Sequence, residues 1–491
     1  MTRFCPPRPS HSWAASNKVP HVATWAELEA AVRGQQVDLL FSIVNDEVLP
    51  PSALTLPRVM AINYHDAPLP RYAGIHATSW ALMAGEKEHA ITWHVMSDRV
   101  DFGDILVQEH FGIAPDDNAL TLNAKCYAAA QRAFRTLLGH LERGTTTRKP
   151  QSESARTFFG RHKRPANAGI IDPNTPAQTL ENLGRALDFG VYENPLCAAR
   201  IWTGDRFIVA SSIVLAESGP HALPGTIINA GPDWLRMAAA DGSRDVRLLG
   251  LKELDGSPAN LTDARFAVAR TLMMPPADAL AEIVRVDAAA HKHEKKWVAR
   301  LGAMSPIVMP LISGKPTGES GVLSIDVGTR DASSAAALFC AYLARVSRAA
   351  SFDLLLHTPG QVPAGSAAAA LFESHVPIKI ECEPTDATAP FADRVRTALA
   401  DAERMGSFAK DVVIRFPTLR NVAELKLGAM WHAAIELGPN NGAAPRAAIT
   451  LRADGSGKVS LAFRREIVGE QAARAIAEQF HVLLKSADAG A

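Results

Sequence analysis

The sequence predicts an α/β protein with a mostly parallel, doubly wound sheet, then a small barrel-like β domain, then a further α/β half-domain. Three observations lead to this prediction. Two short runs, "VDLLFSIV" (37–44) and "RVMAIN" (58–63), are apolar without alternation, as in strands covered on both faces. Short strand patterns follow one another at roughly ten-residue spacing between residues 197 and 254. Beyond residue 305, helix and strand patterns alternate.

The first domain is expected over residues 1–150. "HAITWHVM" (89–96) and "DILVQEHFGI" (104–113) predict two further strands. After the capping residue Asn118, apolar residues at helical spacing continue towards Gly144, which predicts a helix of about six turns. "TTTRKPQSESART" (145–157) is polar and lacks periodicity, so we expect a linker there.

The remaining domain boundaries are placed where the predicted pattern of helices and strands changes. A small β domain is expected over 155–255, with a helix at "PAQTLENLGRAL" and strands at "CAARIWTG", "RFIVASSIV", "LPGTIINAG", "WLRMAAADG" and "VRLLGLKEL". A linker is expected over 256–304; it holds the charged run "HKHEKKW", whose histidines we expect to be solvated. In the last domain, 305–487, "DVVIRF" (411–416) predicts a strand, and a hairpin turning at Asp454-Gly455 precedes a closing helix.

Composition narrows the class of protein. The 491 residues include 51 Lys and Arg against 51 Asp and Glu, a balance that does not favour nucleic acid or an anionic membrane as partner. The apolar runs fall short of the roughly 20 residues of a membrane span, and early prolines interrupt any signal peptide. The five cysteines (Cys5, Cys126, Cys197, Cys340, Cys382) are scattered, as reduced thiols of a cytosolic chain would be. We therefore expect a soluble cytoplasmic protein.

Polar side chains gather where the predicted strands end. Asn63 and His65 close the second apolar run, and Asp101 follows the strand at 89–96, just before Phe102-Gly103-Asp104. In open α/β sheets, ligands bind at such strand ends. A lone Asn or His there is more often a turn former, so the case rests on the combination. His94 alternates with core positions, which favours a structural role.

This constellation resembles the catalytic domain of the 10-formyltetrahydrofolate-dependent formyltransferases, whose Asn, His and Asp occur in this order and at about this spacing. The resemblance covers about residues 20–150. "NYHDAPLPRYAGIHATSW" and "LDFGVYENPL" (187–196) look most like the formylation domains of nonribosomal peptide synthetases. "LPGTI" (223–227) is similar to the small OB-like β domain that follows the catalytic domain in many of these enzymes. Residues 305–487 resemble the C-terminal half of a condensation domain, without that family's His-His-x-x-x-Asp-Gly motif.

The resemblance implies a chemistry for the three residues. As an amine attacks the formyl carbon, Asn63 and His65 would donate hydrogen bonds to the developing oxyanion. Asp101 would orient His65, favour its imidazolium form and relay the proton that the amine loses. The co-substrate is 10-formyltetrahydrofolate, no metal is required, and the folate is expected near Val48, Leu49, Leu69 and Pro70. The family's first βαβ unit is incomplete here: its opening strand, first helix and next strand are missing or degraded, which would expose one side of the sheet.

The resemblance also suggests the acceptor. We expect the α-amine of an aminoacyl group held on a peptidyl carrier protein, with a carrier protein or adenylation module of a nonribosomal peptide synthetase as partner. Two alternatives stay open. One is formylation of a free small amine, such as an amino acid derivative or amino sugar. The other is a catalytically dead scaffold that docks a synthetase.

Overall fold

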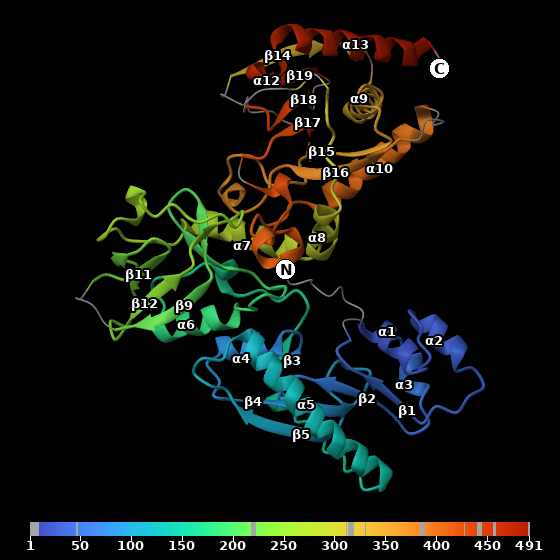
Figure 1. The fold of residues 1–491 in the computed structure, drawn as a ribbon, viewed down its shortest axis with the longest axis vertical. Coiled ribbons are helices and arrows are strands. Elements are labelled where there is room, and N and C mark those ends of the chain that lie inside the picture. Colours follow the sequence, from blue (N-terminus) through green and yellow to red (C-terminus); the bar gives the residue numbers. More distant parts are fainter. Residues whose placement is uncertain are drawn as a thin grey trace. The chain divides into compact units, whose positions relative to one another are not determined.

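The structure is a computed structural model that describes residues 9–45, 48–217, 222–310, 312, 319–328, 330–382, 388–426, 428–438, 444–454 and 458–489. The chain divides into two compact units, Met1–Arg161 and His162–Ala491. Each unit is described by itself below, with its elements labelled as in Figure 1.

The first unit is built around one four-stranded sheet. Its elements are α1 (Pro9–Ser16), α2 (Trp25–Ala31), β1 (Leu39–Ser42), α3 (Ser52–Thr55), β2 (Met60–His65), β3 (Ala73–Gly74), α4 (Ala77–Met83), β4 (Glu88–Val95), β5 (Ile105–Gly112), α5 (Ala119–Glu142) and β6 (Phe158–Phe159). The predicted strands and the long helix are all confirmed. Asn118 caps α5, accepting a hydrogen bond from the backbone N–H of Thr121 at 2.9 Å.

The direction of the strands differs from the prediction. The sheet order is β1-β2-β4-β5, and β1 pairs with β2 in parallel, whereas β2–β4 and β4–β5 are antiparallel. The prediction of a mostly parallel sheet is therefore wrong for this unit. The apolar residues of β1 and β2 are buried or half-buried, and that burial, rather than parallel pairing, produced the pattern. β4 and β5 are joined by a short connection, which allows antiparallel pairing without a crossover.

Strand alternation separates the core from the polar side chains. Ile62 and Tyr64 of β2 pack with Trp93 of β4 and with Cys126 of α5 in one buried cluster. Figure 1 shows α5 running along β4 and β5, whose strands it contacts. Because successive side chains of a strand point to opposite faces, Asn63 and His65 point away from α5.

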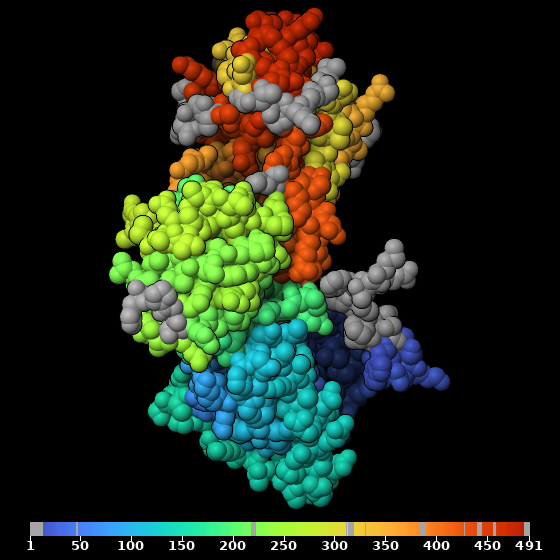
Figure 2. Space-filling model, turned by 60° about the vertical axis from the view of Figure 1, so that its left-hand side comes forward, coloured from blue at the N-terminus to red at the C-terminus, as the bar shows by residue number. Residues whose placement is uncertain are grey.

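The second unit begins with two small sheets. Their elements are α6 (Ala177–Ala186), β7 (Ala199–Trp202), β8 (Phe207–Ala210), β9 (Ser212–Ala216), β10 (Ile227–Ala230), β11 (Trp234–Ala238), β12 (Asp245–Leu249) and β13 (Lys252–Glu253). The strands form the sheets β10-β11-β12-β9 and β13-β8-β7, so the barrel expected from sequence does not close. Two predicted strands each divide in two, at Ser211 and at Gly250, whose φ of 59° ends β12. In Figure 2 this part (green to yellow-green) gathers into one lobe.

The stretch 256–304, expected to be a linker, holds helices α7 (Ala277–His291) and α8 (Glu294–Gly302). Trp297 of α8 is fully buried and belongs to the core of the following elements. The sequence did not predict α8 because the charged run "HKHEKKW" has few apolar residues, and these are widely spaced. His291, expected to be solvated, is half-buried beside Arg164 and Glu294.

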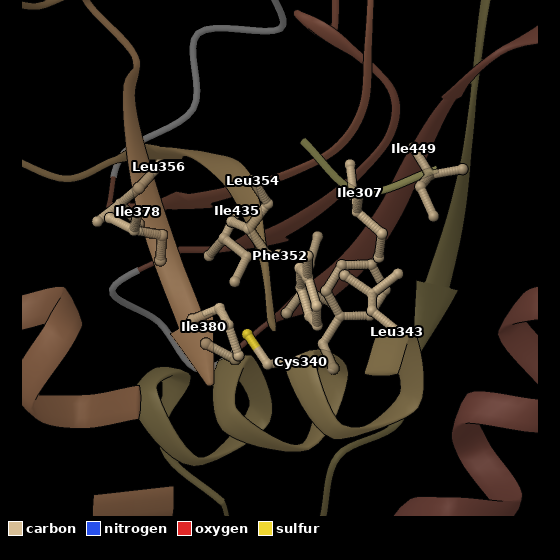
Figure 3. Close-up of a cluster of buried hydrophobic side chains, with 14 of the residues drawn as sticks. Ile307, Cys340, Leu343, Phe352, Leu354, Leu356, Ile378, Ile380, Ile435 and Ile449 are labelled. Carbon is tan, nitrogen blue, oxygen red and sulfur yellow. The ribbon is translucent and has the colours of Figure 1, made fainter. Parts of the chain in front are cut away.

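The last part of the unit carries a six-stranded mixed sheet. Its elements are β14 (Ser320–Ile325), α9 (Ala332–Ser347), β15 (Ser351–His357), β16 (Val376–Glu381), α10 (Thr388–Met405), α11 (Val412–Arg415), β17 (Trp431–Leu437), β18 (Ala447–Ala453), β19 (Val459–Arg464), α12 (Arg465–Val468) and α13 (Glu470–Ala489). The order is β14-β19-β18-β17-β15-β16. The predicted hairpin is confirmed as antiparallel β18–β19, although Gly455 lies outside the described residues. Figure 3 shows Cys340 and Leu343 of α9 directed at the apolar side chains of these strands.

One predicted strand is a helical turn. "DVVIRF" has β-branched residues that favour a strand, but residues Val412–Arg415 form α11. Asp411 pairs with Arg415 four residues later at 3.0 Å, a spacing that places both on one face of a helix. Tertiary contacts of these charged groups therefore override the local preference.

Two findings concern the whole described chain. Within the residues that the structure describes, no helix is long and apolar enough to cross a membrane. Cys126, Cys197, Cys340 and Cys382 are free thiols, and Cys5 lies outside the described residues.

Candidate active site

Asn63, His65 and Asp101 lie together in the first unit. Asn63 and His65 point to the same face of β2, and Asp101 lies in the connection from β4 to β5. The amide nitrogen Nδ2 of Asn63 donates to Oδ1 of Asp101 at 3.3 Å. The ring nitrogen Nδ1 of His65 is 3.7 Å from Oδ2 of Asp101. The trio singled out in the sequence thus meets around one carboxylate.

His94 also belongs to this group. In the β2–β4 register His94 stands opposite Asn63, and its Nε2 lies 3.2 Å from Asn63 Nδ2 and 3.5 Å from Asp101 Oδ1. Its Nδ1 faces the carbonyl oxygen of Val95 at 2.9 Å, so that nitrogen carries a proton. In the neutral ring Nε2 then accepts from Asn63. The sequence favoured a structural role for His94 because the alternation showed its burial and not its cross-strand partner.

Asp101 is a buried carboxylate that stays ionised. It is 9% exposed, and burial alone would raise its pKa. The charge of His65, the nearby ring of His94 and the backbone N–H of Gly74, 2.9 Å from Oδ2, act in the other direction. Together they lower the pKa of Asp101 to about 2. The site therefore holds a negative charge at neutral pH.

The ring of His65 is oriented by a contact with a backbone carbonyl of the following loop. Its Nε2 lies 2.8 Å from the carbonyl oxygen of Tyr72, and its side chain is 6% exposed. Nδ1 faces two carboxylates, Asp101 at 3.7 Å and Asp66 at 3.8 Å. An N–H on Nδ1 can therefore be directed to a third acceptor without breaking the bond to Tyr72.

The loop after β2 approaches the carboxylate through a glycine. Gly74 has φ of 101°, and a Cβ there would meet the carbonyl oxygen of Phe159 at 2.1 Å. A side chain would push the loop away from Asp101, so glycine is required for the N–H contact.

The residues expected around the folate lie on two loops. Val48 is 86% exposed and Leu49 is half-buried, both between β1 and α3. Leu69 is buried in a small cluster with Ala73 and Ile105, so its side chain packs the loop. Pro70 follows it through a cis peptide bond. That these four residues bind folate stays a prediction.

The described residues contain no group of three or more His, Cys, Asp or Glu side chains placed to hold a metal ion. The histidines and carboxylates of the site contact Asn63, backbone carbonyls and one another.

Comparisons with known proteins locate a family within the first unit. The model of the formyl transferase family matches residues 7–138, a range that contains all four site residues. The chain is also similar to solved structures, at low sequence identity. WlaRD, a sugar 3N-formyl transferase, is 17% identical with a TM-score of 0.39, covering 49% of this chain and 81% of that one.

Two further structures are similar to the same degree. The N-formyltransferase from Helicobacter canadensis, solved with folinic acid and dTDP-3-aminofucose, is 18% identical over 48% of this chain and 81% of that chain, with a TM-score of 0.40. A HypX variant from Aquifex aeolicus is 17% identical over 49% of this chain and 42% of that chain, with a TM-score of 0.38. The assignment of an enzyme class rests on the family match. The match of residues 7–138 to this family model identifies the chain as an enzyme of the one-carbon transferase class.

Proposed function

We propose that the chain transfers a formyl group from 10-formyltetrahydrofolate to a primary amine, with Asn63, His65 and Asp101 as its catalytic residues. The observation that carries the proposal is the convergence of an amide and an imidazole on a buried carboxylate with a pKa of about 2. The family match over residues 7–138 supports the same reaction.

Asn63 and His65 would stabilise the charge that develops on the formyl oxygen. The attacking nitrogen forms a bond to the formyl carbon, and the carbonyl electron pair moves to oxygen. Both hydrogens of the Asn63 amide have protein acceptors, His94 and Asp101, so the substrate oxygen would replace one of them. His65 would donate from Nδ1 while Nε2 keeps its contact with Tyr72. Each such donor typically contributes on the order of 3 kcal/mol in the transition state.

The pKa of Asp101 limits its role in proton transfer. A general base works best with a pKa near the operating pH, and a carboxylate with a pKa of about 2 is a weak base at neutral pH. We therefore assign Asp101 to orienting Asn63 and His65 and to passing the amine proton onward, directly or through water. The intermediate then collapses: the bond between the formyl carbon and the folate nitrogen breaks, and that nitrogen takes up the proton. The products are a formamide and tetrahydrofolate.

The acceptor that we favour is the α-amine of an aminoacyl group on a peptidyl carrier protein. This choice is supported by the likeness of "NYHDAPLPRYAGIHATSW" and "LDFGVYENPL" to formylation domains of nonribosomal peptide synthetases, and by the condensation-like residues 305–487 in the same chain. The equal number of basic and acidic residues argues against a tRNA-bound substrate, whose phosphates call for a basic surface. A carrier protein or an adenylation module would be the partner, in the cytoplasm.

The test is a transfer assay on aminoacyl carrier proteins with 10-formyltetrahydrofolate, followed by intact mass. The wild-type chain is expected to add one formyl group, and His65→Ala to add none at matched times. His110→Ala is the matched control, because His110 is exposed on β5 and its ring contacts Gln108. Transfer to free amino acid derivatives or amino sugars, with carriers unmodified, would replace the proposed acceptor. Absence of transfer to every amine, with no stabilisation by folate, would identify a docking scaffold.

A further inference from the structure

The segment 149–159, here called the return segment, packs against the active site. It includes most of the stretch expected to be a linker, because its sequence is polar and without periodicity. In the structure its backbone pairs with Ile105 at Lys149 and with β3 through β6. All of these contacts lie within the first unit.

Asp101 has a backbone conformation that an L-residue adopts with difficulty. Its φ is 51°, in the left-handed region, where an Asp is tolerated better than most residues but is still disfavoured. Such a conformation persists where the surroundings hold it. Here the carbonyl oxygen of Asp101 accepts from Nε2 of Gln151 at 3.1 Å and from Nη1 of Arg156 at 3.2 Å.

The same two side chains hold the residues on either side. Gln151 Nε2 also donates to the carbonyl of Gly103 at 2.7 Å, and Arg156 Nη2 donates to the carbonyl of Val100 at 2.8 Å. The turn also packs closely against β4 at Gly103, where a Cβ would meet the carbonyl oxygen of Val95 at 1.8 Å. Three backbone carbonyls of the turn are thus bound by two side chains of the return segment.

The return segment also fixes the loop that faces Asp101. The backbone N–H of Tyr72 donates to Oγ1 of Thr157 at 2.8 Å, and that of Ala73 to the carbonyl of Thr157 at 3.0 Å. The ring of Phe159 stacks between those of Tyr72 and Trp80, at 5.7 and 4.8 Å between centroids. Both partners of the Gly74–Asp101 hydrogen bond are therefore held by one short segment.

We propose that Gln151 and Arg156 are positioning residues, which hold the Asp101 backbone in its left-handed conformation and thereby direct its carboxylate to Gly74, His65 and Asn63. The catalytic consequence rests on the proposed function, whereas the positioning itself does not. Without these donors the turn relaxes to φ below zero, and the carboxylate leaves the three groups that it contacts. A displacement of about 1 Å of a catalytic group can lower a rate about 100-fold.

The variants are Gln151→Leu and Arg156→Ala, separately and combined, with Arg156→Lys as the conservative change. Arg99→Ala is the matched control. Arg99 stacks on Phe102, as Arg156 does, but its guanidinium nitrogens donate to the exposed Glu153 and not to the Asp101 carbonyl. Circular dichroism and thermal unfolding establish that each variant is folded.

Two readouts separate positioning from a structural role. In the transfer assay, kcat is expected to fall about 10- to 100-fold in Arg156→Ala and in the double variant, with the KM for the folate within about 2-fold. Arg156→Lys should regain part of kcat, since it keeps one donor. In a carbon-13 NMR titration of labelled aspartate carboxyls, the pKa of Asp101 should rise from about 2 towards its usual value of 3.8 in the same variants and stay unchanged in Arg99→Ala.

The proposal is overturned if folded Gln151 and Arg156 variants keep both the kcat and the Asp101 pKa of Arg99→Ala. It is also overturned if KM rises and kcat does not change, because the segment would then serve substrate binding. Should the wild-type chain transfer no formyl group to any amine, the proposed function fails while the NMR titration still decides the positioning. If the alanine variant does not fold, Gln151→Leu and Arg156→Lys carry the same titration.

Discussion

Each unit of the molecule buries a group of charged side chains, and the two groups are built differently. In the first unit Asp101 is contacted by two imidazoles, one amide and one backbone N–H. In the second unit, buried ion pairs join three carboxylates to three guanidiniums: Asp287, Glu294 and Asp411 with Arg164, Arg200 and Arg415. Arg200 and Asp411 are 0% exposed.

The difference separates a structural network from a reactive site. A guanidinium does not lose its proton in a protein, so the charges in the second unit are permanent. Burial would raise the pKa of Asp411, but the charges of Arg200 and Arg415 lower it well below its usual range. The neighbours of Asp101 are imidazoles, whose ring nitrogens can donate or accept a hydrogen bond, and an amide, which can change partners. The ion pairs of the second unit fix a fold, and the Asp101 group of the first unit can respond to a substrate.

The largest expected effect is on the stability of the second unit. Asp411→Asn removes the anion between Arg200 and Arg415 and leaves two buried cations without it. We expect a loss of about 3–5 kcal/mol in the free energy of unfolding. Urea unfolding of the full chain, followed by circular dichroism and by the tryptophan fluorescence to which Trp297 of this unit contributes, measures it. A loss below about 1 kcal/mol would mean that the network does not hold the unit together.

The next effect is on activity. Asp101→Asn keeps the shape of the side chain and removes its charge. We expect kcat for formyl transfer to fall about 10²- to 10³-fold. The free energy of unfolding should change by less than in Asp411→Asn, because no guanidinium loses its partner. Equal activity of Asp101→Asn and wild type would contradict the distinction between the two groups.

A smaller effect appears in acid. The pKa of Asp101 is lowered from 3.8 to about 2 in the folded chain, so its contribution to stability is fully present above pH 3.8 and is lost as the pH falls through about 2. The difference of about two pKa units corresponds to about 2–3 kcal/mol. The measurement is the difference in unfolding free energy between wild type and Asp101→Asn, followed from pH 6 down to pH 2. A difference that does not shrink in acid would show that Asp101 is not the group that titrates.

The smallest effect is expected at an exposed pair. Arg474 and Glu470 of α13 form an ion pair at 3.1 Å, with side chains that are 63% and 39% exposed. Arg474→Ala should change the free energy of unfolding by less than about 0.5 kcal/mol. This variant is also the reference for Asp411→Asn in the same urea experiment. A loss comparable to that of Asp411→Asn would show that burial does not determine how much these ion pairs contribute to stability.

The sequence predicted the three proposed catalytic residues, but it did not predict the residues that hold them in place. Asn63, His65 and Asp101 were found because their types and spacing resemble a family, and each lies near a strand end that composition reveals. The place of His94 depends on the β2–β4 register, which a single sequence does not specify. Gln151 and Arg156 act on backbone carbonyls, and such contacts leave no periodic pattern in residues 145–157.

The fold was predictable in its elements and less so in their pairing. Apolar runs marked β1, β2 and β4, but burial of both faces produces the same pattern in parallel and antiparallel strands. Around Asp411, β-branched residues predicted a strand, and the buried pairs with Arg200 and Arg415 favour a helical turn. Interactions between distant residues decide such cases.

The most direct test of the account follows the formyl carbon itself. Carbon-13-labelled 10-formyltetrahydrofolate is incubated with a set of aminoacyl carrier proteins and free amines, using the wild-type chain and His65→Ala, and the label is observed by NMR. The account predicts that the wild type moves the label from the folate to a formamide and that His65→Ala leaves it on the folate. The same formamide signal with both chains, or label released only as formate, would contradict formyl transfer at this site.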